Sequence, residues 1–252
     1  MNKLPLMILG LVAVACASNE AQIREAIRKD PSIVFDAIEE HPEQFMAVVN
    51  RSAKLAQQKK YESQVAEMKQ QEDQDLKNPK NPKLDPVRRM SGDDSGKIVI
   101  VEYADFQCPA CGMAYGPLKE FKEKHKRQVQ FYYKNLPLDF HPLAAPAAHY
   151  FEALRLQDKA KAQQFYDFVY ENQKSLSEDF LKQTAKKFGA DMKRLEKDRH
   201  SDAVEKVLAD DRNEFQSFHF NGTPAIIING VSMYGAQSLE DLERVSQLTL
   251  KH

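Results

Sequence analysis

The chain is poor in cysteine and lacks tryptophan: its 252 residues include three cysteines, Cys16, Cys108 and Cys111. No charge of one sign dominates, since the net charge is −1 with 29% charged residues, and nothing indicates a nucleic-acid surface. The apolar run from Leu4 to Ala15 is too short to span a bilayer as a mature helix. With 42% hydrophobic residues, the sequence predicts one well-packed domain with an appendage.

Two of the cysteines stand two residues apart in the motif Cys108-Pro109-Ala110-Cys111. The β-branched run 98–101 before the motif is typical of a buried strand, and the apolar spacing after it predicts a helix. Cys108 is therefore expected at the helix start, with Pro109 at the first helical position. Unpaired amides and the helix dipole stabilise an anion there, which favours the reactive thiolate.

The second thiol indicates redox chemistry, because Cys111 lies one turn on and can displace whatever Cys108 captures. Half of a zinc site is the alternative, but the sequence offers neither a second cysteine pair nor two closely spaced histidines. We therefore predict no resident metal and no cofactor. Copper(I) binding by the two thiolates stays open as an alternative function.

A second signature lies far downstream. Thr223-Pro224 precedes the apolar run 225–228, and Asn229-Gly230 then separates this run from residues 231–234. Asn-Gly between two such runs predicts a β-hairpin, and proline is allowed at the first position of a strand. A cis bond before Pro224 would expose backbone groups for pairing with an extended peptide; an ordinary trans proline is the alternative.

Together these features resemble the thioredoxin fold, and the long insert makes the chain similar to the DsbA-like thiol–disulfide oxidoreductases of the bacterial envelope. The resemblance implies an α/β fold: a thioredoxin domain with an inserted helical domain, preceded by an N-terminal helical extension. It implies that Cys108 attacks, that Cys111 resolves, and that Pro224 is cis beside them. Pro109 and Ala110 would tune the potential, and Thr223 is the residue found before that proline in isomerases.

Glu102 interrupts the predicted buried strand, where a carboxylate is unfavourable unless it is paired or protonated. It also stands six residues before Cys108, where DsbA proteins hold a buried glutamate. A raised pKa would let Glu102 exchange a proton with the resolving thiol. The alternative is that the pleat turns Glu102 to solvent. The family pairs this acid with a lysine, for which Lys134 is a candidate.

The N-terminus reads as a secretion signal over residues 1–17. Ordinary cleavage before Ser18 is one processing route. We favour the other, a bacterial lipoprotein signal that ends before Cys16, although Ala13 stands where such signals usually carry leucine. A lipidated Cys16 would anchor the protein to a membrane of the bacterial envelope or periplasm, with no other membrane contact.

The rest of the chain divides into a helical extension at 18–77, a linker at 78–96 and the thioredoxin domain at 97–250, with its helical insert at about 139–219. Short amphipathic helices cannot bury their apolar faces alone. We expect residues 19–77 to form a homo-oligomer, and packing within one chain is the alternative.

The predicted function is thiol–disulfide exchange on exported thiol-containing proteins, as an oxidase, a disulfide isomerase or both, with a membrane redox partner. Thr223 and the extension favour isomerase or mixed activity. A structural envelope lipoprotein is the remaining alternative, and the intact cysteine pair argues against it.

Overall fold

A computed structural model describes residues 11–92 and 94–251, and the chain divides into two units, residues 1–65 and 66–252. Much of the predicted leader, residues 1–10, lies outside the described residues, as does the side chain of Cys16. In the described part of the chain, no helix is long and apolar enough to cross a membrane.

The first unit is helical. It contains α1 (Leu11–Lys29), α2 (Ser32–Glu40) and most of α3 (Pro42–Lys77). The Asp30 carboxylate accepts a hydrogen bond from the Ser32 amide at 3.0 Å, as the predicted start of the second helix requires. Many of the unit's large apolar side chains are exposed: Ile23, Ile27, Ile33, Val34, Phe35, Phe45, Met46, Val48, Val49, Leu55, Tyr61 and Val65.

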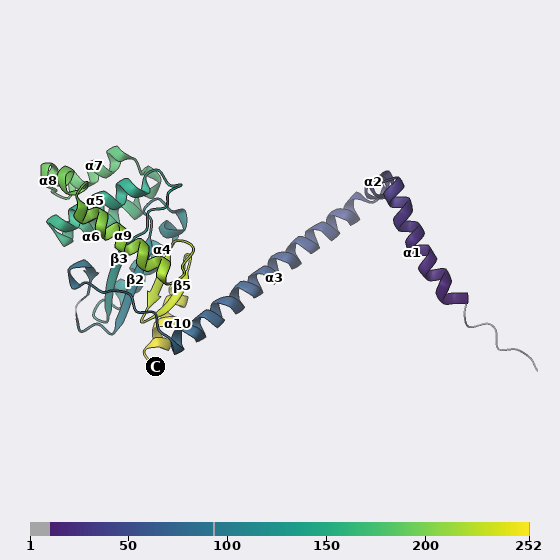
Figure 1. Ribbon diagram of the computed structural model, residues 1–252, viewed down its shortest axis with the longest axis horizontal. Helices are drawn as coiled ribbons and strands as arrows, with labels where there is room; N and C mark the ends of the chain where they lie inside the picture. Colours follow the sequence, from purple (N-terminus) through teal and green to yellow (C-terminus); the bar gives the residue numbers. More distant parts are fainter. Residues whose placement is uncertain (1–10, 93, 252) are drawn as a thin grey trace, which may run out of the picture. The chain divides into compact units, whose positions relative to one another are not determined.

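The second unit is built on a five-stranded sheet with the order β1-β3-β2-β4-β5. Figure 1 labels β2, β3 and β5 of this sheet. Its strands are β1 (Arg89–Ser91), β2 (Ile98–Ala104), β3 (Val129–Asn135), β4 (Ala225–Ile228) and β5 (Val231–Tyr234). The two central strands, β2 and β3, run parallel, and the other neighbours are antiparallel. The predicted hairpin is confirmed: β4 and β5 are joined by Asn229 and Gly230, which both have positive φ.

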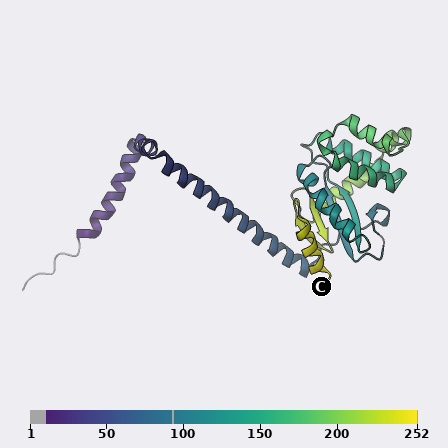
Figure 2. The ribbon, with the colours of Figure 1, turned by 180° about the vertical axis from the view of Figure 1, so that it is seen from behind.

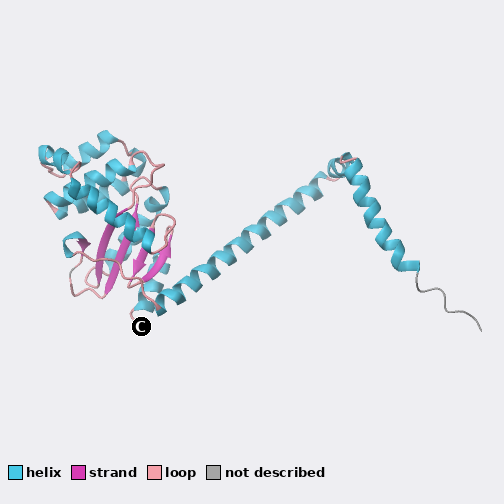
Figure 3. Cartoon of the chain, in the orientation of Figure 1, coloured by secondary structure: helices cyan, strands magenta, loops and turns pink. Residues whose placement is uncertain are grey.

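Helices cover both faces of this sheet, as the cyan and magenta elements of Figure 3 show. Side chains of β2 alternate between two cores, as the pleat requires. Ile98, Ile100 and Ala104 lie in the larger core, whereas Val101 and Tyr103 lie in the smaller one with Phe215 and Phe220. A strand covered on both faces explains the continuous apolar run in the sequence.

The helical insert lies between β3 and β4. Its helices are α5 (Ala144–Gln157), α6 (Lys159–Glu171), α7 (Glu178–Lys187), α8 (Met192–Asp198) and α9 (Asp202–Ser217). The last two differ from the single helix that periodicity predicts over 191–218, because the Ser201 side chain caps a new helix at the Val204 amide. Ser175 and Glu178 have the spacing of a capping box, but the cap of α7 is Ser177. Ser175 lies in a short 3-10 turn at 173–175.

After β5 the chain ends in α10 (Leu239–Thr249), which packs against α4 (Pro109–Lys124), the helix that follows the cysteine motif (Figure 2). The last turns of α3 belong to this unit and are fixed to the edge strand β5. The buried Asp75 carboxylate accepts hydrogen bonds from the Ser232 amide at 2.8 Å and from Lys80 Nζ at 2.6 Å. The segment after α3 also contains the 3-10 turn η1 (Pro86–Arg88) and β1, so part of the predicted linker belongs to the sheet.

Candidate active site

Cys108 caps the N-terminus of α4, and Pro109 takes the first helical position, as the sequence predicts. The backbone of Cys108 is extended (φ −67°, ψ 121°), and its carbonyl accepts the first helical hydrogen bond from the Gly112 amide at 3.1 Å. The thiol is buried but not sealed, with 8% of the residue exposed. A substrate sulfur can therefore reach the Cys108 sulfur from the surface, beside the positive end of the helix dipole.

The sulfur of Cys108 lies 3.6 Å from the carbonyl oxygen of Thr223, and the Thr223–Pro224 peptide bond is cis. These contacts bring the two sequence signatures together. The Cys111 thiol donates a hydrogen bond to the Cys108 sulfur and lowers the pKa of Cys108 from 9.0 to about 5. Burial opposes this shift, and the Thr223 side chain and hydrogen bonds from the backbone of Cys111 and Ala110 add to it.

Cys111 is fully buried, and both thiols are free. Burial raises the pKa of Cys111 well above 9.0, and the neighbouring Cys108 raises it further. The Asp105 amide lies 3.5 Å from the Cys111 sulfur and acts in the opposite direction. The pair therefore holds one thiolate and one protonated thiol near neutral pH, which is the division of roles that disulfide exchange needs.

Asp105 holds the turn before Cys108 in place. Its buried carboxylate accepts hydrogen bonds from the Gln107 amide at 2.7 Å and from the Leu138 amide at 3.1 Å. His141 Nδ1 lies 2.7 Å from the same carboxylate, so this histidine is part of the turn's support. The sequence offered no signal for Asp105, because one aspartate after a strand is ordinary.

Glu102 is completely buried and points into the larger core, so the alternative that the pleat turns it to solvent is wrong. The Tyr166 hydroxyl donates a hydrogen bond to its Oε2 at 2.7 Å, while Oε1 has no hydrogen-bond partner. Burial raises the pKa of Glu102 from 4.5 to about 7, and Tyr166 and Lys122 oppose that rise. A carboxyl group half protonated near pH 7 can both give and take a proton.

The lysine whose charge acts on Glu102 is Lys122, not Lys134. Lys134 instead pairs with Glu214 on the other side of the sheet. Lys122 lies with its Nζ 3.8 Å from the Phe131 ring centroid, and burial lowers its pKa to about 8. The sequence carried the signal, because Lys122 shares a helical face with the buried Cys111, Tyr115 and Leu118, at spacings of eleven, seven and four residues, respectively.

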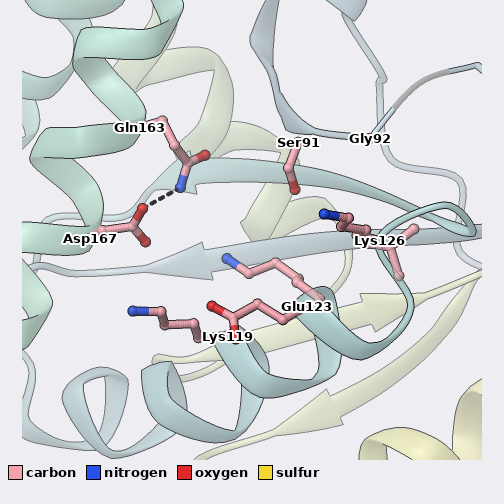
Figure 4. A pocket seen from close by; sticks show the side chains of 9 residues that line it. Ser91, Gly92, Lys119, Glu123, Lys126, Gln163 and Asp167 are labelled. Carbon is pink, nitrogen blue, oxygen red and sulfur yellow. Dashed lines mark hydrogen bonds between the residues drawn. The ribbon is translucent and has the colours of Figure 1, made fainter.

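Lys122 also lines a surface cavity of about 210 Å³ between α4 and α6. Figure 4 shows Lys119 and Glu123 of α4 facing Gln163 and Asp167 of α6 across this cavity. Most charged residues of α4 are exposed, whereas Lys122 is half-buried with its ammonium group over the rings of Phe131 and Tyr166.

Replacing Lys122 by methionine should raise the pKa of Glu102 by about one unit, because a nearby cation favours the ionised carboxylate. The measurement is a ¹³C NMR titration of the Glu102 carboxyl group. Lys119→Met is the matched control, because Lys119 pairs with Glu171 at the surface and should leave Glu102 unchanged. An unchanged Glu102 titration in Lys122→Met would show that this lysine does not act on the acid.

Comparison with known proteins identifies the family of this chain. A family model described as thioredoxin matches residues 85–246. The "Probable disulfide bond formation protein D" of Bacillus cereus is 32% identical over 151 residues, which cover 55% of this chain and 68% of that protein. The chain also matches Na⁺/H⁺ antiporters such as "NhaA 1" of Mycolicibacterium vanbaalenii, but it spans only 27% of that protein's length.

Solved structures share the fold. The thiol-disulfide exchange protein alpha-DsbA2 of Wolbachia pipientis has a TM-score of 0.57 at 21% identity, with 63% of this chain and 85% of that chain covered. ScsC of Proteus mirabilis in a transitional conformation has a TM-score of 0.58 at 20% identity, with 96% of this chain and 99% of that chain covered. The chain therefore belongs to the thioredoxin family and is related to a disulfide bond formation protein.

Proposed function

We propose that this protein catalyses disulfide exchange in exported proteins through a mixed disulfide at Cys108. The observation that carries the proposal is the opposed ionisation of the two thiols. The pKa of Cys108 is lowered to about 5 and that of Cys111 is raised well above 9.0. A stabilised thiolate is both a ready nucleophile and a good leaving group, which makes its disulfide oxidising.

In the oxidising direction, a substrate thiolate attacks the sulfur of Cys108 in the Cys108–Cys111 disulfide. The bond between the two cysteines breaks, and a substrate–Cys108 disulfide forms. The sulfur of Cys111 leaves with the electron pair and takes a proton from Glu102, which its raised pKa makes available. A second substrate thiolate then attacks the substrate sulfur and releases Cys108 as thiolate. Two electrons pass from the substrate dithiol to the protein.

Isomerisation begins with the reduced protein, in which both cysteines are thiols or thiolates. The Cys108 thiolate attacks a substrate disulfide, and another substrate thiol or Cys111 resolves the mixed species. If Cys111 resolves it, the ionised Glu102 accepts the thiol proton. The carbonyl of Thr223, beside the Cys108 sulfur, is available for pairing with a substrate backbone amide.

Two assays test the proposal. Insulin reduction reports exchange, and refolding of scrambled ribonuclease reports isomerisation. We expect both activities from the full chain. Activity in neither assay, with the reduced thiols intact, would refute the proposal, and insulin reduction without ribonuclease refolding would restrict it to exchange without isomerisation.

Copper(I) binding remains the alternative use of the cysteine pair, because two adjacent thiolates suit this soft ion. The burial of Cys111 and its raised pKa disfavour a second thiolate near neutral pH. Titration of the reduced protein with copper(I) separates the two functions, since sub-micromolar binding without insulin reduction would favour the metal site.

We further propose that the protein works in the bacterial envelope, anchored through a lipid on Cys16 and reoxidised by a membrane redox partner. The similarity to a disulfide bond formation protein supports a site of action where exported proteins acquire disulfides. Mass spectrometry of the protein recovered from membranes would test the anchor. A diacylated N-terminal cysteine supports the anchor, and a mature chain that starts at Ser18 contradicts it.

Self-association of residues 19–77 is the last part of the proposal. The apolar stripe of α3, which includes Phe45, Val48 and Val49, is exposed in the part of the chain that the structure describes. Burial of such side chains against another copy would be favourable by about 25 cal/mol per Å². Light scattering of the full chain should therefore give a dimer or a larger assembly.

The double variant Val48→Lys/Val49→Lys should lower the measured mass to that of one chain, because a charge at a buried contact is strongly unfavourable. Gln57→Lys, an exposed polar site on the same helix, is the matched control. A monomeric wild-type chain, or an assembly that withstands the double variant, would contradict self-association through this stripe.

A further inference from the structure

One side chain of the helical insert, Gln173, reaches the turn that carries the attacking thiol. Gln173 begins the 3-10 turn between α6 and α7. Its Nε2 donates hydrogen bonds to the carbonyl oxygens of Phe106, at 2.9 Å, and Cys108, at 2.8 Å. One side-chain amide thus binds the carbonyls on either side of Gln107, although Gln173 is 65 residues from Cys108 in the sequence.

The carbonyl of Cys108 also accepts the first hydrogen bond of α4, from the Gly112 amide. Its orientation and that of the helix start are therefore linked. The same helix start presents the backbone of Ala110 and Cys111 to the Cys108 sulfur. A group that fixes the Cys108 peptide therefore also fixes how the sulfur meets these amides.

Gly112 makes room for this contact. A Cβ at residue 112 would lie 2.2 Å from Oε1 of Gln173 and 2.9 Å from its Cδ. Every other residue type would therefore push the glutamine amide away. Because the atoms in the way belong to the end of a flexible side chain, alanine at 112 should displace Gln173 rather than the helix backbone.

The geometry points to Gln173 as a positioning residue for disulfide exchange: through the Phe106 and Cys108 carbonyls it couples the helical insert to the reactivity of the attacking thiol, and Gly112 permits the contact. This inference rests on the proposed function. Gln173 does not touch the sulfur, so it acts through the peptide that carries it. If Gln173 only docked the insert, its loss would lower the stability of the protein but leave the pKa of the Cys108 thiol unchanged.

The test is a thiolate titration at 240 nm on the reduced full chain. Gln173→Ala and Gly112→Ala should each raise the apparent pKa of Cys108 by about half to one unit, as expected for weakened hydrogen bonds to a charged group. For a one-unit rise, alkylation of Cys108 should slow roughly threefold at pH 5.5 and stay unchanged at pH 8. Both variants should show the same displacement of the pH profile.

Three comparisons sharpen the result. The double variant should shift no further than the single variants, because both remove the same contact. Gln173→Glu should not rescue, since a carboxylate cannot donate to a carbonyl. Asn172→Ala, which removes the neighbouring amide's bond to the Phe168 carbonyl within the insert, should leave the titration unchanged.

An unchanged Cys108 titration in both single variants, or shifts that add in the double variant, would overturn the inference and leave Gln173 a docking residue. Alanine is also a better helix former than glycine, so unfolding would not explain a shift in Gly112→Ala. The proposed function fails separately, because a wild-type chain inactive on insulin would refute it whatever these titrations show.

Discussion

Replacing Cys108 by serine should abolish insulin reduction, with a loss on the order of 10⁴-fold or more, as when other enzymes lose their nucleophile. A serine hydroxyl does not ionise near neutral pH, and it cannot form a mixed disulfide. Replacing Cys111 by serine should have a different effect, because the attacking sulfur remains. The serine hydroxyl can still donate a hydrogen bond to that sulfur, but it cannot resolve the intermediate.

The Cys111→Ser variant should therefore accumulate a covalent complex with a disulfide-containing substrate such as insulin, because the Cys108 thiolate attacks the substrate disulfide and one substrate sulfur leaves. The complex is visible as a reducible band by non-reducing electrophoresis. Cys108→Ser is the matched control, because it keeps the buried Cys111 and should trap nothing. If the Cys108→Ser variant trapped substrate, or if both variants trapped it equally, Cys108 would not be the attacking cysteine.

Replacing Glu102 by glutamine should make stability less dependent on pH. The folded-state pKa of Glu102 is about 7, against 4.5 for the ordinary group. The folded protein therefore holds a proton that the unfolded chain has lost, and wild-type stability falls as pH rises from 4.5 through 7. The difference is about 3 kcal/mol. For each protein we compare the change in the free energy of unfolding between pH 4 and pH 8. This change should be about 3 kcal/mol more favourable to the folded state in Glu102→Gln than in the wild type.

Urea unfolding of the reduced proteins between pH 4 and pH 8 measures this effect. Lys122, whose pKa is lowered to about 8, also titrates at the top of this range. Both proteins carry Lys122, so the difference between their curves, and not the wild-type slope alone, reports Glu102. Glu123→Gln, at an exposed site on α4, is the control and should follow the wild type. Parallel pH curves for Glu102→Gln and wild type would mean that the acid is ionised when folded.

The same variant should slow insulin reduction near pH 7 by about 10²-fold, because loss of a general acid–base group typically has at least that effect. Glutamine keeps the shape of the side chain and can still accept the Tyr166 hydrogen bond, so the core should remain packed. A rate unchanged from wild type would show that the proton of Cys111 reaches solvent by another route.

Local patterns predicted most of the thioredoxin domain. The β-branched run gave β2, Asn229-Gly230 gave the hairpin turn, and the apolar spacing after Cys111 gave α4. Each of these signals depends on neighbours within a few residues, which is why sequence alone carries it. The start of α4 at Pro109 could be predicted for the same reason.

The parts that could not be predicted depend on contacts between distant segments. Helical spacing places Lys122 on the buried face of α4, but only the tertiary packing shows that its charge, and not that of Lys134, acts on Glu102. Gln173 is separated from Cys108 by 65 residues, and nothing in its surroundings marks an active-site contact. The break between α8 and α9 was missed because periodicity continues across a capped turn.

The central claim is that the start of α4 and the Cys111 thiol hold the Cys108 sulfur ionised. A titration of the reduced protein, followed by thiolate absorbance at 240 nm, tests it most directly. The account predicts one step near pH 5 for Cys108 and a second well above pH 9 for Cys111. A first step near the pKa of about 8.5 of a free cysteine would contradict it.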